Sequence, residues 1–257
     1  MAEPRIIIIG HSHVNAMRGA LRACAFSSTP TEVLRHVEDS YAKSPEVVYL
    51  HEATVLAGTL GPDDLLALTF GGNQYNIVGL MRHPEPFDFL LPSNAQEDYS
   101  PETQPIPYQA MRAHFASSLQ NGFGKLFEQI SQASQAPVIC LEVPPPKEDE
   151  SYILRAADAY FLERGISDVG VTPAPLRLKL WRAQQEAVAA LCDKIGICYV
   201  PCPQDTRDAK GYLAPAYYAP DATHANADYG VHVLRQLEHI LRTHSGRRAD
   251  LKSKAVQ

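Results

Sequence analysis

The chain has 257 residues, and its 45% of hydrophobic and 20% of charged residues are typical of a globular protein and exclude a disordered, collagen-like or coiled-coil chain. Its formal net charge of -6 leaves no basic surplus for phosphate groups, so we expect neither nucleic acid nor an anionic membrane as a partner. No apolar run approaches the about 20 residues of a transmembrane helix and no secretion signal is visible, so we expect a cytoplasmic protein.

Short apolar runs predict five β-strands. The first, residues 5–10, is a run of isoleucines that ends in glycine, which is typical of a strand buried on both faces of a parallel sheet. The other four predicted strands are residues 31–37, 65–70, 138–143 and 197–200. Residues 46–60 fit neither the helical nor the strand period and are left unassigned.

Apolar residues at three- and four-residue steps predict helices at residues 14–24, 111–119, 178–191 and 233–241. Strands that alternate with helices imply right-handed crossovers, and therefore an α/β fold with a central parallel sheet of about five strands and helices on both faces. We expect a single domain over residues 1–245, with a proline-rich excursion at about 80–107. Residues 246–257 are expected to form a flexible tail.

Polar residues follow the first and third predicted strands, at the sheet edge where parallel α/β folds bind ligands. Ser12 follows the first strand, where its hydroxyl would be exposed and its backbone N–H, at a helix N-terminus, would point at a developing oxyanion. Gly71-Gly72-Asn73 follows the third strand, where glycine lets the backbone approach a ligand and the Asn73 amide would add a hydrogen-bond donor.

Asp221 precedes His224 by three residues, just before the last predicted helix. In a turn, this carboxylate can accept a hydrogen bond from the histidine Nδ1, which leaves Nε2 free as a base. Alone, each of these features is more often structural: a serine caps a helix, an Asp-x-x-His forms a capped turn, and a Gly-Gly-Asn forms a loop. Their combination, at predicted strand ends and before the last predicted helix, favours a serine nucleophile.

This combination resembles the SGNH hydrolase superfamily, the GDSL-type esterases and lipases. Gly10-His11-Ser12 is similar to the first block of that family, Gly71-Gly72-Asn73 to the third and Asp221-Ala222-Thr223-His224 to the fifth. The resemblance implies a flavodoxin-like three-layer sandwich and a triad of Ser12, His224 and Asp221. The chain departs from the family pattern at two positions, because His11 and Gln74 stand where the family has aspartate.

The resemblance further implies an oxyanion hole formed by the Ser12 N–H, the Asn73 side chain and a backbone N–H after the second strand. The family has a glycine at the third position, and no glycine stands clearly there in this chain. We assign that donor to the backbone of Ser40, because every residue except proline carries an N–H.

Five further residues are candidates for substrate contact. His11 and His13 flank Ser12, and Gly72 precedes Asn73. Phe87 and Phe89 belong to an apolar patch in the proline-rich excursion, which would either wall the acyl pocket or be buried against a second copy of the chain in a homo-oligomer.

The predicted function is hydrolysis of a small or carbohydrate-borne acyl ester through an acyl-enzyme intermediate, with no cofactor and no metal ion. Three alternatives use the same residues or the same fold. They are an acyltransferase with the same triad, a metal-dependent hydrolase with His11 and His13 as ligands, and a non-catalytic binding module. The five cysteines are interpreted as buried thiols rather than a zinc site.

Overall fold

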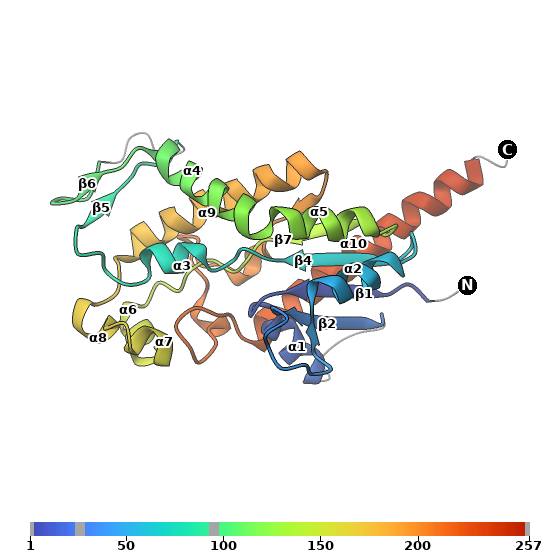
Figure 1. Ribbon diagram of the computed structural model, residues 1–257, viewed down its shortest axis with the longest axis horizontal. Coiled ribbons are helices and arrows are strands. Elements are labelled where there is room, and N and C mark those ends of the chain that lie inside the picture. Colours follow the sequence, from blue (N-terminus) through green and yellow to red (C-terminus); the bar gives the residue numbers. More distant parts are fainter. Residues whose placement is uncertain (1–2, 24–28, 93–97, 255–257) are drawn as a thin grey trace.

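A six-stranded parallel sheet forms the centre of the computed structural model, which describes residues 3–23, 29–92 and 98–254 (Figure 1). The strand order is β3-β2-β1-β4-β7-β8, and every neighbouring pair is parallel. The strands are β1 (Ile6–Gly10), β2 (Thr31–His36), β3 (Val47–Val48), β4 (Leu65–Thr69), β7 (Val138–Leu141) and β8 (Cys198–Val200).

Alternate residues of the central strands pack on opposite faces of this sheet. In β1, Ile7 and Ile9 contribute to one hydrophobic cluster, whereas Ile6 and Ile8 contribute to the other, and all four side chains are buried. Because both faces of a parallel sheet are covered by helices, such a strand has no polar side, as the isoleucine run predicts.

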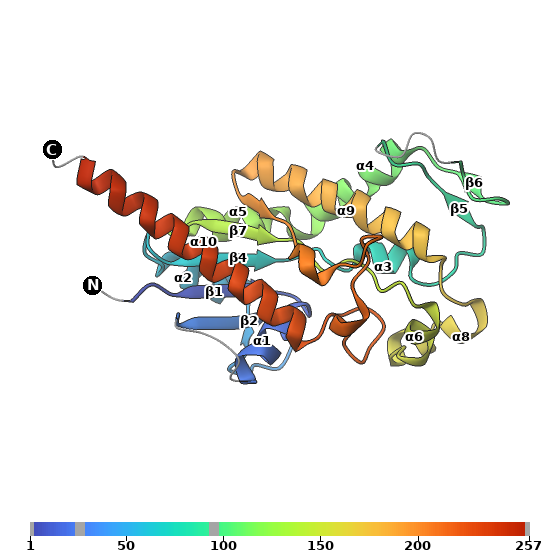
Figure 2. The same cartoon turned by 180° about the vertical axis from the view of Figure 1, so that it is seen from behind.

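Two groups of helices cover the two faces (Figures 1 and 2). One face carries α1 (Val14–Arg22) and α10 (Ala227–Lys254), and the other carries α2 (Leu50–Gly58), α4 (Tyr108–Leu119), α5 (Lys125–Ala133) and α9 (Ala174–Ile195). Figure 2 shows α10 crossing the back of the sheet beside α1. A π-helical turn, η2 (Gln120–Gly124), joins α4 to α5.

The shorter helices lie between the larger elements. They are α3 (Gln74–Gly79), α6 (Glu150–Arg155), α7 (Ala159–Leu162), α8 (Ile166–Val169) and the 3₁₀ turns η3 (Gln204–Thr206) and η4 (Pro215–Tyr217).

The fold class predicted from the sequence is confirmed, and the order β2-β1-β4-β7-β8 is the flavodoxin-like order. The sixth strand, β3, lies in the stretch left unassigned, because two strand residues followed directly by α2 mix the two periods. Helix α10 continues through residues 246–254, where a flexible tail was expected. Cys198 is exposed, so the interpretation of the cysteines as buried thiols is wrong at this position.

The proline-rich excursion is held to the core by buried groups. Its strands β5 (Phe87–Asp88) and β6 (Gln104–Pro105) pair in parallel, away from the main sheet (Figure 1). The buried Asp88 carboxylate accepts hydrogen bonds from Ser100 and lies 3.0 Å from Lys179 Nζ.

None of the helices in the described ranges is both long and apolar enough to cross a membrane.

Candidate active site

Ser12 lies at the carboxyl end of β1, in the turn that leads into α1. The preceding Gly10 pairs with Thr69 of β4, and a Cβ atom on Gly10 would lie 2.3 Å from the Thr69 carbonyl oxygen. Only glycine therefore lets the two strands stay paired up to this turn. The Ser12 carbonyl accepts the hydrogen bond of Asn15 N–H at 3.1 Å, whereas the Ser12 N–H has no acceptor among the described residues.

The turn before α10 orients His224 through Asp221. One carboxylate oxygen, Oδ1, accepts hydrogen bonds from the backbone N–H groups of Thr223 (2.9 Å) and His224 (2.7 Å). The other, Oδ2, lies 3.0 Å from His224 Nδ1. Burial raises the pKa of Asp221, but the hydrogen bonds and charge of His224 outweigh burial and hold this pKa well below its usual range, so the carboxylate is ionised.

Ser12 and His224 meet although they are 212 residues apart in the sequence. The distance from Ser12 Oγ to His224 Nε2 is 2.7 Å, which is a hydrogen bond between a hydroxyl and an imidazole nitrogen. The structure thus brings together the three residues that the sequence analysis selected, in the order Ser12, His224, Asp221. This geometry lets the histidine accept the serine proton.

An open cavity of about 760 Å³ lies beside the Ser12 hydroxyl, at the carboxyl ends of β1 and β2. Its lining residues are His11, Ser12, Arg35, His36, Val37, Glu38, Asp39, Tyr41, Leu50, Asn73, Asn121, Gly122, Phe123, Lys125 and Leu126. Charged, amide and aromatic side chains outnumber aliphatic ones in this set, so the cavity suits a polar ligand.

Asn73 shares this cavity with Ser12 and is exposed to it. Its Oδ1 accepts a hydrogen bond from Asn76 Nδ2 at 2.8 Å. Because the oxygen end of the amide is already bonded, the Nδ2 end is the donor available to a ligand.

His11 lines the cavity as the sequence analysis expected of a substrate contact. Its ring centroid lies 5.1 Å from those of Phe70 and Phe123 and 5.7 Å from that of His36. Burial, reinforced by His36 and Arg35, lowers the pKa of His11 to about 4, so the ring is neutral at pH 7.

His13 and Gly72 lie behind the site rather than in the cavity, which corrects the expectation that they contact substrate. The His13 side chain is 6% exposed and its ring centroid is 5.0 Å from that of His224. Burial lowers the pKa of His13 to about 3, so it packs as a neutral ring. A Cβ atom on Gly72 would lie 2.8 Å from His13 Cδ2, so this glycine makes room for the histidine.

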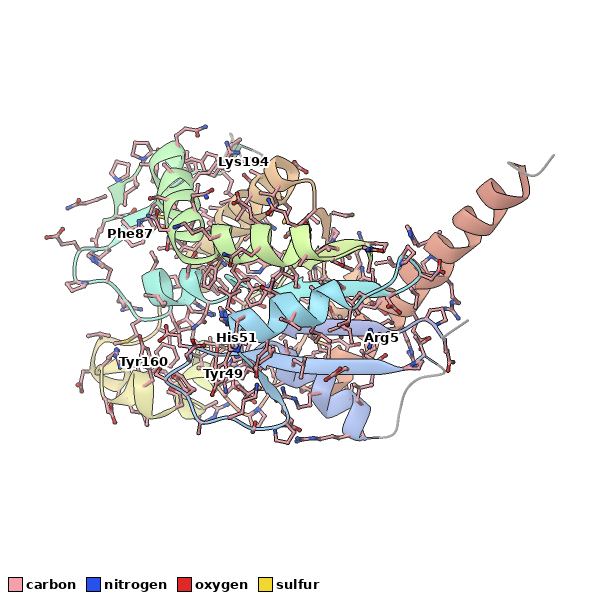
Figure 3. The ribbon with its side chains drawn as sticks, turned by 45° about the vertical axis from the view of Figure 1, so that its right-hand side comes forward. Arg5, Tyr49, His51, Phe87, Tyr160 and Lys194 are labelled. Atoms are coloured by element: carbon pink, nitrogen blue, oxygen red, sulfur yellow. The ribbon has the colours of Figure 1, made fainter. Side chains whose placement is uncertain are left out.

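The cavity is also not lined by Phe87, Phe89 or Ser40, which the sequence analysis expected at the site. Phe89 is fully buried in the core against Tyr108, and Phe87 lines a separate cavity in the excursion, so neither forms an acyl wall. Figure 3 labels Phe87 on this excursion. Ser40 is exposed in the loop after β2, whose neighbouring Glu38 and Asp39 line the cavity instead.

The sequence analysis missed several residues around the site. Arg35 and His36 end β2, so the rule that selected Ser12 and Asn73 could have found them. Phe123 and Lys125 come from the junction of η2 and α5, for which the sequence gives no strand-end signal. Within the described ranges, no group of three or more His, Cys, Asp and Glu side chains could hold a metal ion.

No family model and no curated protein matches this chain. Among solved structures, it is similar to an extracellular lipase from Streptomyces rimosus, with 13% identity, a TM-score of 0.52 and coverage of 92% of this chain and 99% of that one. The chain has the same α/β fold as this lipase.

Two further solved structures match over similar lengths. A phospholipase A1 from Streptomyces albidoflavus has 13% identity and a TM-score of 0.48, with 93% of this chain and 99% of that chain covered. A carbohydrate acetylesterase from Sinorhizobium meliloti has 12% identity and a TM-score of 0.45, with 94% and 99% covered.

Proposed function

We propose that this protein is a serine-dependent ester hydrolase. The observation that carries the proposal is the continuous chain from Ser12 Oγ to His224 Nε2 at 2.7 Å and from His224 Nδ1 to Asp221 Oδ2 at 3.0 Å, next to an open cavity. A nucleophile bonded to a base that a third group orients is the arrangement needed for acyl transfer through a covalent intermediate.

The reaction follows from these contacts. Ser12 Oγ attacks the ester carbonyl carbon while its proton passes to His224 Nε2. The Ser12 N–H and Asn73 Nδ2 donate to the oxyanion that develops on the carbonyl oxygen. The tetrahedral intermediate then expels the alcohol, which takes the proton from His224. Water attacks the acyl-enzyme with His224 again acting as the base, which releases the acid and restores Ser12.

The lining of the cavity supports an ester with a small acyl group on a polar alcohol, such as a carbohydrate. Arg35, Asn121 and Lys125 offer hydrogen-bond donors, and Tyr41 and Phe123 offer flat aromatic surfaces. A long alkyl chain would instead need a continuous apolar wall, which this set of side chains does not supply.

Labelling with a fluorophosphonate, followed by peptide mass mapping, tests the proposed nucleophile. Wild-type protein should carry the label on Ser12, and Ser12→Ala should lose both the label and ester hydrolysis while it keeps its circular dichroism spectrum. Ser44→Ala removes an exposed serine in the loop after β2 and serves as the matched control. Labelling at another residue, or hydrolysis that persists in Ser12→Ala, would contradict the assignment.

The same preparation separates the alternatives. Unchanged hydrolysis after treatment with a chelator contradicts a metal-dependent hydrolase. A mixture of acetylated sugar and a second alcohol distinguishes hydrolysis from acyl transfer, because only a transferase forms the new ester faster than free acid. We expect free acid as the main product, with p-nitrophenyl acetate cleaved faster than the palmitate ester.

A further inference from the structure

Lys147 is a buried lysine directly beneath the turn that carries Asp221 and His224. Only 2% of the residue is exposed. Its Nζ donates hydrogen bonds to the carbonyl oxygens of Ala219, at 2.7 Å, and of Asp221, and lies 3.8 Å from Asp221 Oδ1. One ammonium group therefore contacts the backbone on both sides of Pro220 and the carboxylate itself.

The turn that Lys147 contacts is closed by its own hydrogen bonds. Asp221 N–H donates to the Ala219 carbonyl at 2.8 Å, and Ala219 N–H donates to the His224 carbonyl at 3.1 Å. The Tyr152 hydroxyl also donates to the Ala219 carbonyl at 2.8 Å. A displacement of the Ala219 carbonyl would therefore move Asp221 and His224 together.

The groups around Lys147 leave Asp221 as its counter-ion. The rings of Tyr152, from α6, and Tyr218, from the segment after η4, lie 4.8 Å and 5.1 Å from Nζ. Arg177 of α9 donates to the backbone carbonyls of Lys147 and Glu148. The Glu148 side chain forms an ion pair with Lys210. Within the described part of the chain, Asp221 is the one carboxylate within ion-pair distance of Lys147 Nζ.

A buried ammonium group lowers the stability of the fold unless each of its protons has a hydrogen-bond acceptor or a negative charge beside it. An apolar side chain of the same size would fill the space without that cost, and replacing a buried ion pair by apolar groups is often neutral or stabilising. The ammonium group is therefore better explained by its effect on the position of Asp221 than by the stability of the fold.

We propose that Lys147 is a positioning residue of the active site, whose ammonium group fixes the turn from Ala219 to His224 so that Asp221 Oδ2 stays directed at His224 Nδ1. This proposal rests on the proposed function. Since misplacing a reactive group by about 1 Å can cost about a hundredfold in rate, loss of the ammonium group should lower kcat rather than raise KM.

The pH dependence of the reaction follows from the burial of Lys147. Burial lowers the pKa of Lys147 to about 8, although Asp221 opposes this shift. Below this pH the ammonium form holds Asp221, and above it the neutral amine loses the charge interaction. Activity should therefore fall as pH rises through about 8. Burial raises the pKa of the facing Tyr218 hydroxyl, which keeps that ring neutral over the same range.

The experiment compares Lys147→Met with Lys210→Met, a substitution of the exposed lysine that pairs with Glu148. Hydrolysis of p-nitrophenyl acetate and the rate of fluorophosphonate labelling are measured from pH 6.5 to 9.5, with melting temperatures as a check of folding. We expect Lys147→Met to lower kcat by about tenfold or more at pH 7 with little change in KM, and to lose the alkaline decline of the wild type. Lys210→Met should match the wild type in kcat and in its pH profile.

A double-mutant cycle separates positioning from a structural role. If Lys147 acts in part through the Asp221 carboxylate, Lys147→Met should lower kcat by a smaller factor in an Asp221→Ala background than in the wild type. Multiplicative losses in the two backgrounds, or wild-type labelling that is constant from pH 6.5 to 9.5, would overturn the proposal. The wild-type profile gives this answer even if Lys147→Met does not fold. Absence of any labelling of wild-type Ser12 would instead overturn the proposed function.

Discussion

The Asn73 amide is held in one orientation by a neighbour that does not line the cavity. Asn76 Nδ2 donates to Asn73 Oδ1 at 2.8 Å, which directs the Asn73 NH₂ group away from that bond. A donor fixed before the reaction stabilises the transition state without reorganisation at the moment of reaction. Asn76 is therefore expected to act on the oxyanion through Asn73.

Asn73→Ala should lower kcat by about a hundredfold with little change in KM, because its donor meets charge that appears only in the transition state. Asn76→Ala should cost less, since Asn73 remains and loses only its fixed orientation. Steady-state kinetics on p-nitrophenyl acetate measure both variants, with Ile77→Ala, at an exposed position of α3 that does not line the cavity, as the control. A rise in KM alone for Asn73→Ala would mark it as a ground-state contact.

Gly72→Ala should lower the activity strongly, although the substitution adds only one methyl group. The new Cβ atom would lie 2.4 Å from Val143 Cγ1 and 2.8 Å from His13 Cδ2, and the His13 ring packs against that of His224. The clash must move His13 or the backbone, and we expect kcat to fall by about tenfold or more. The control is Gly58→Ala, whose Cβ would meet only the Ala133 carbonyl oxygen at 3.7 Å. Equal activity of the two variants would contradict this coupling.

The proline-rich excursion illustrates what can be predicted at the scale of an element. Its six prolines suggested a segment without secondary structure, which is wrong for β5 and β6. Its attachment through Asp88 and Lys179 joins residues 91 apart in sequence and gives no local signal. The apolar residues Phe87 and Phe89 suggested a wall near Ser12 because the segment begins close to Asn73. Burial of Phe89 against Tyr108 instead explains its apolar character.

Asp88→Ala should lower the free energy of unfolding by about 3 kcal/mol without changing the reactivity of Ser12. The substitution removes the acceptor of hydrogen bonds from Ser100 and Phe89 and the carboxylate beside Lys179, all at a buried position. Breaking a buried pair by removing one partner is strongly destabilising. Urea unfolding and the fluorophosphonate labelling rate measure the two effects, with Glu85→Ala as the exposed control. A labelling rate that falls in parallel with stability would contradict the separation of excursion and site.

At the scale of the whole molecule, strong periodic runs predicted the sheet and the long helices. The uninterrupted isoleucines mark β1, and the apolar stripe from Leu178 to Leu191 marks the central part of α9. The short helices α6, α7 and α8 escaped detection because four to six residues do not complete an apolar stripe. Ser12 was predictable because it follows a predicted strand, and Asp221 and His224 because they form a short motif just before the last predicted helix. Lys147 was not predicted, because its role depends on a contact with residues more than 70 positions away.

The buried histidines predict that the folded protein loses stability in mild acid. Burial lowers the pKa of His11 to about 4 and that of His13 to about 3, and it also lowers the pKa of His36, whereas the usual histidine value is 6.5. Between these values the unfolded chain binds protons that the folded chain does not, so the free energy of unfolding decreases as pH falls below about 6.5. His11 and His13 each contribute up to about 1.4 kcal/mol per pH unit.

Urea unfolding at pH 7, 6 and 5 measures this slope in the wild type and in His13→Asn, with His51→Asn as a control at an exposed position. His13→Asn should reduce the slope by about one proton whatever its effect on stability at pH 7, because asparagine does not titrate. The carboxylates Asp88 and Asp221, whose pKa values are lowered in the fold, contribute stability that is lost only as pH falls below their usual range near 3.8, outside this window. A free energy of unfolding that is equal at pH 7 and pH 5 would mean that His11 and His13 take up protons in the folded state, and that neither ring is held in the neutral form around Ser12.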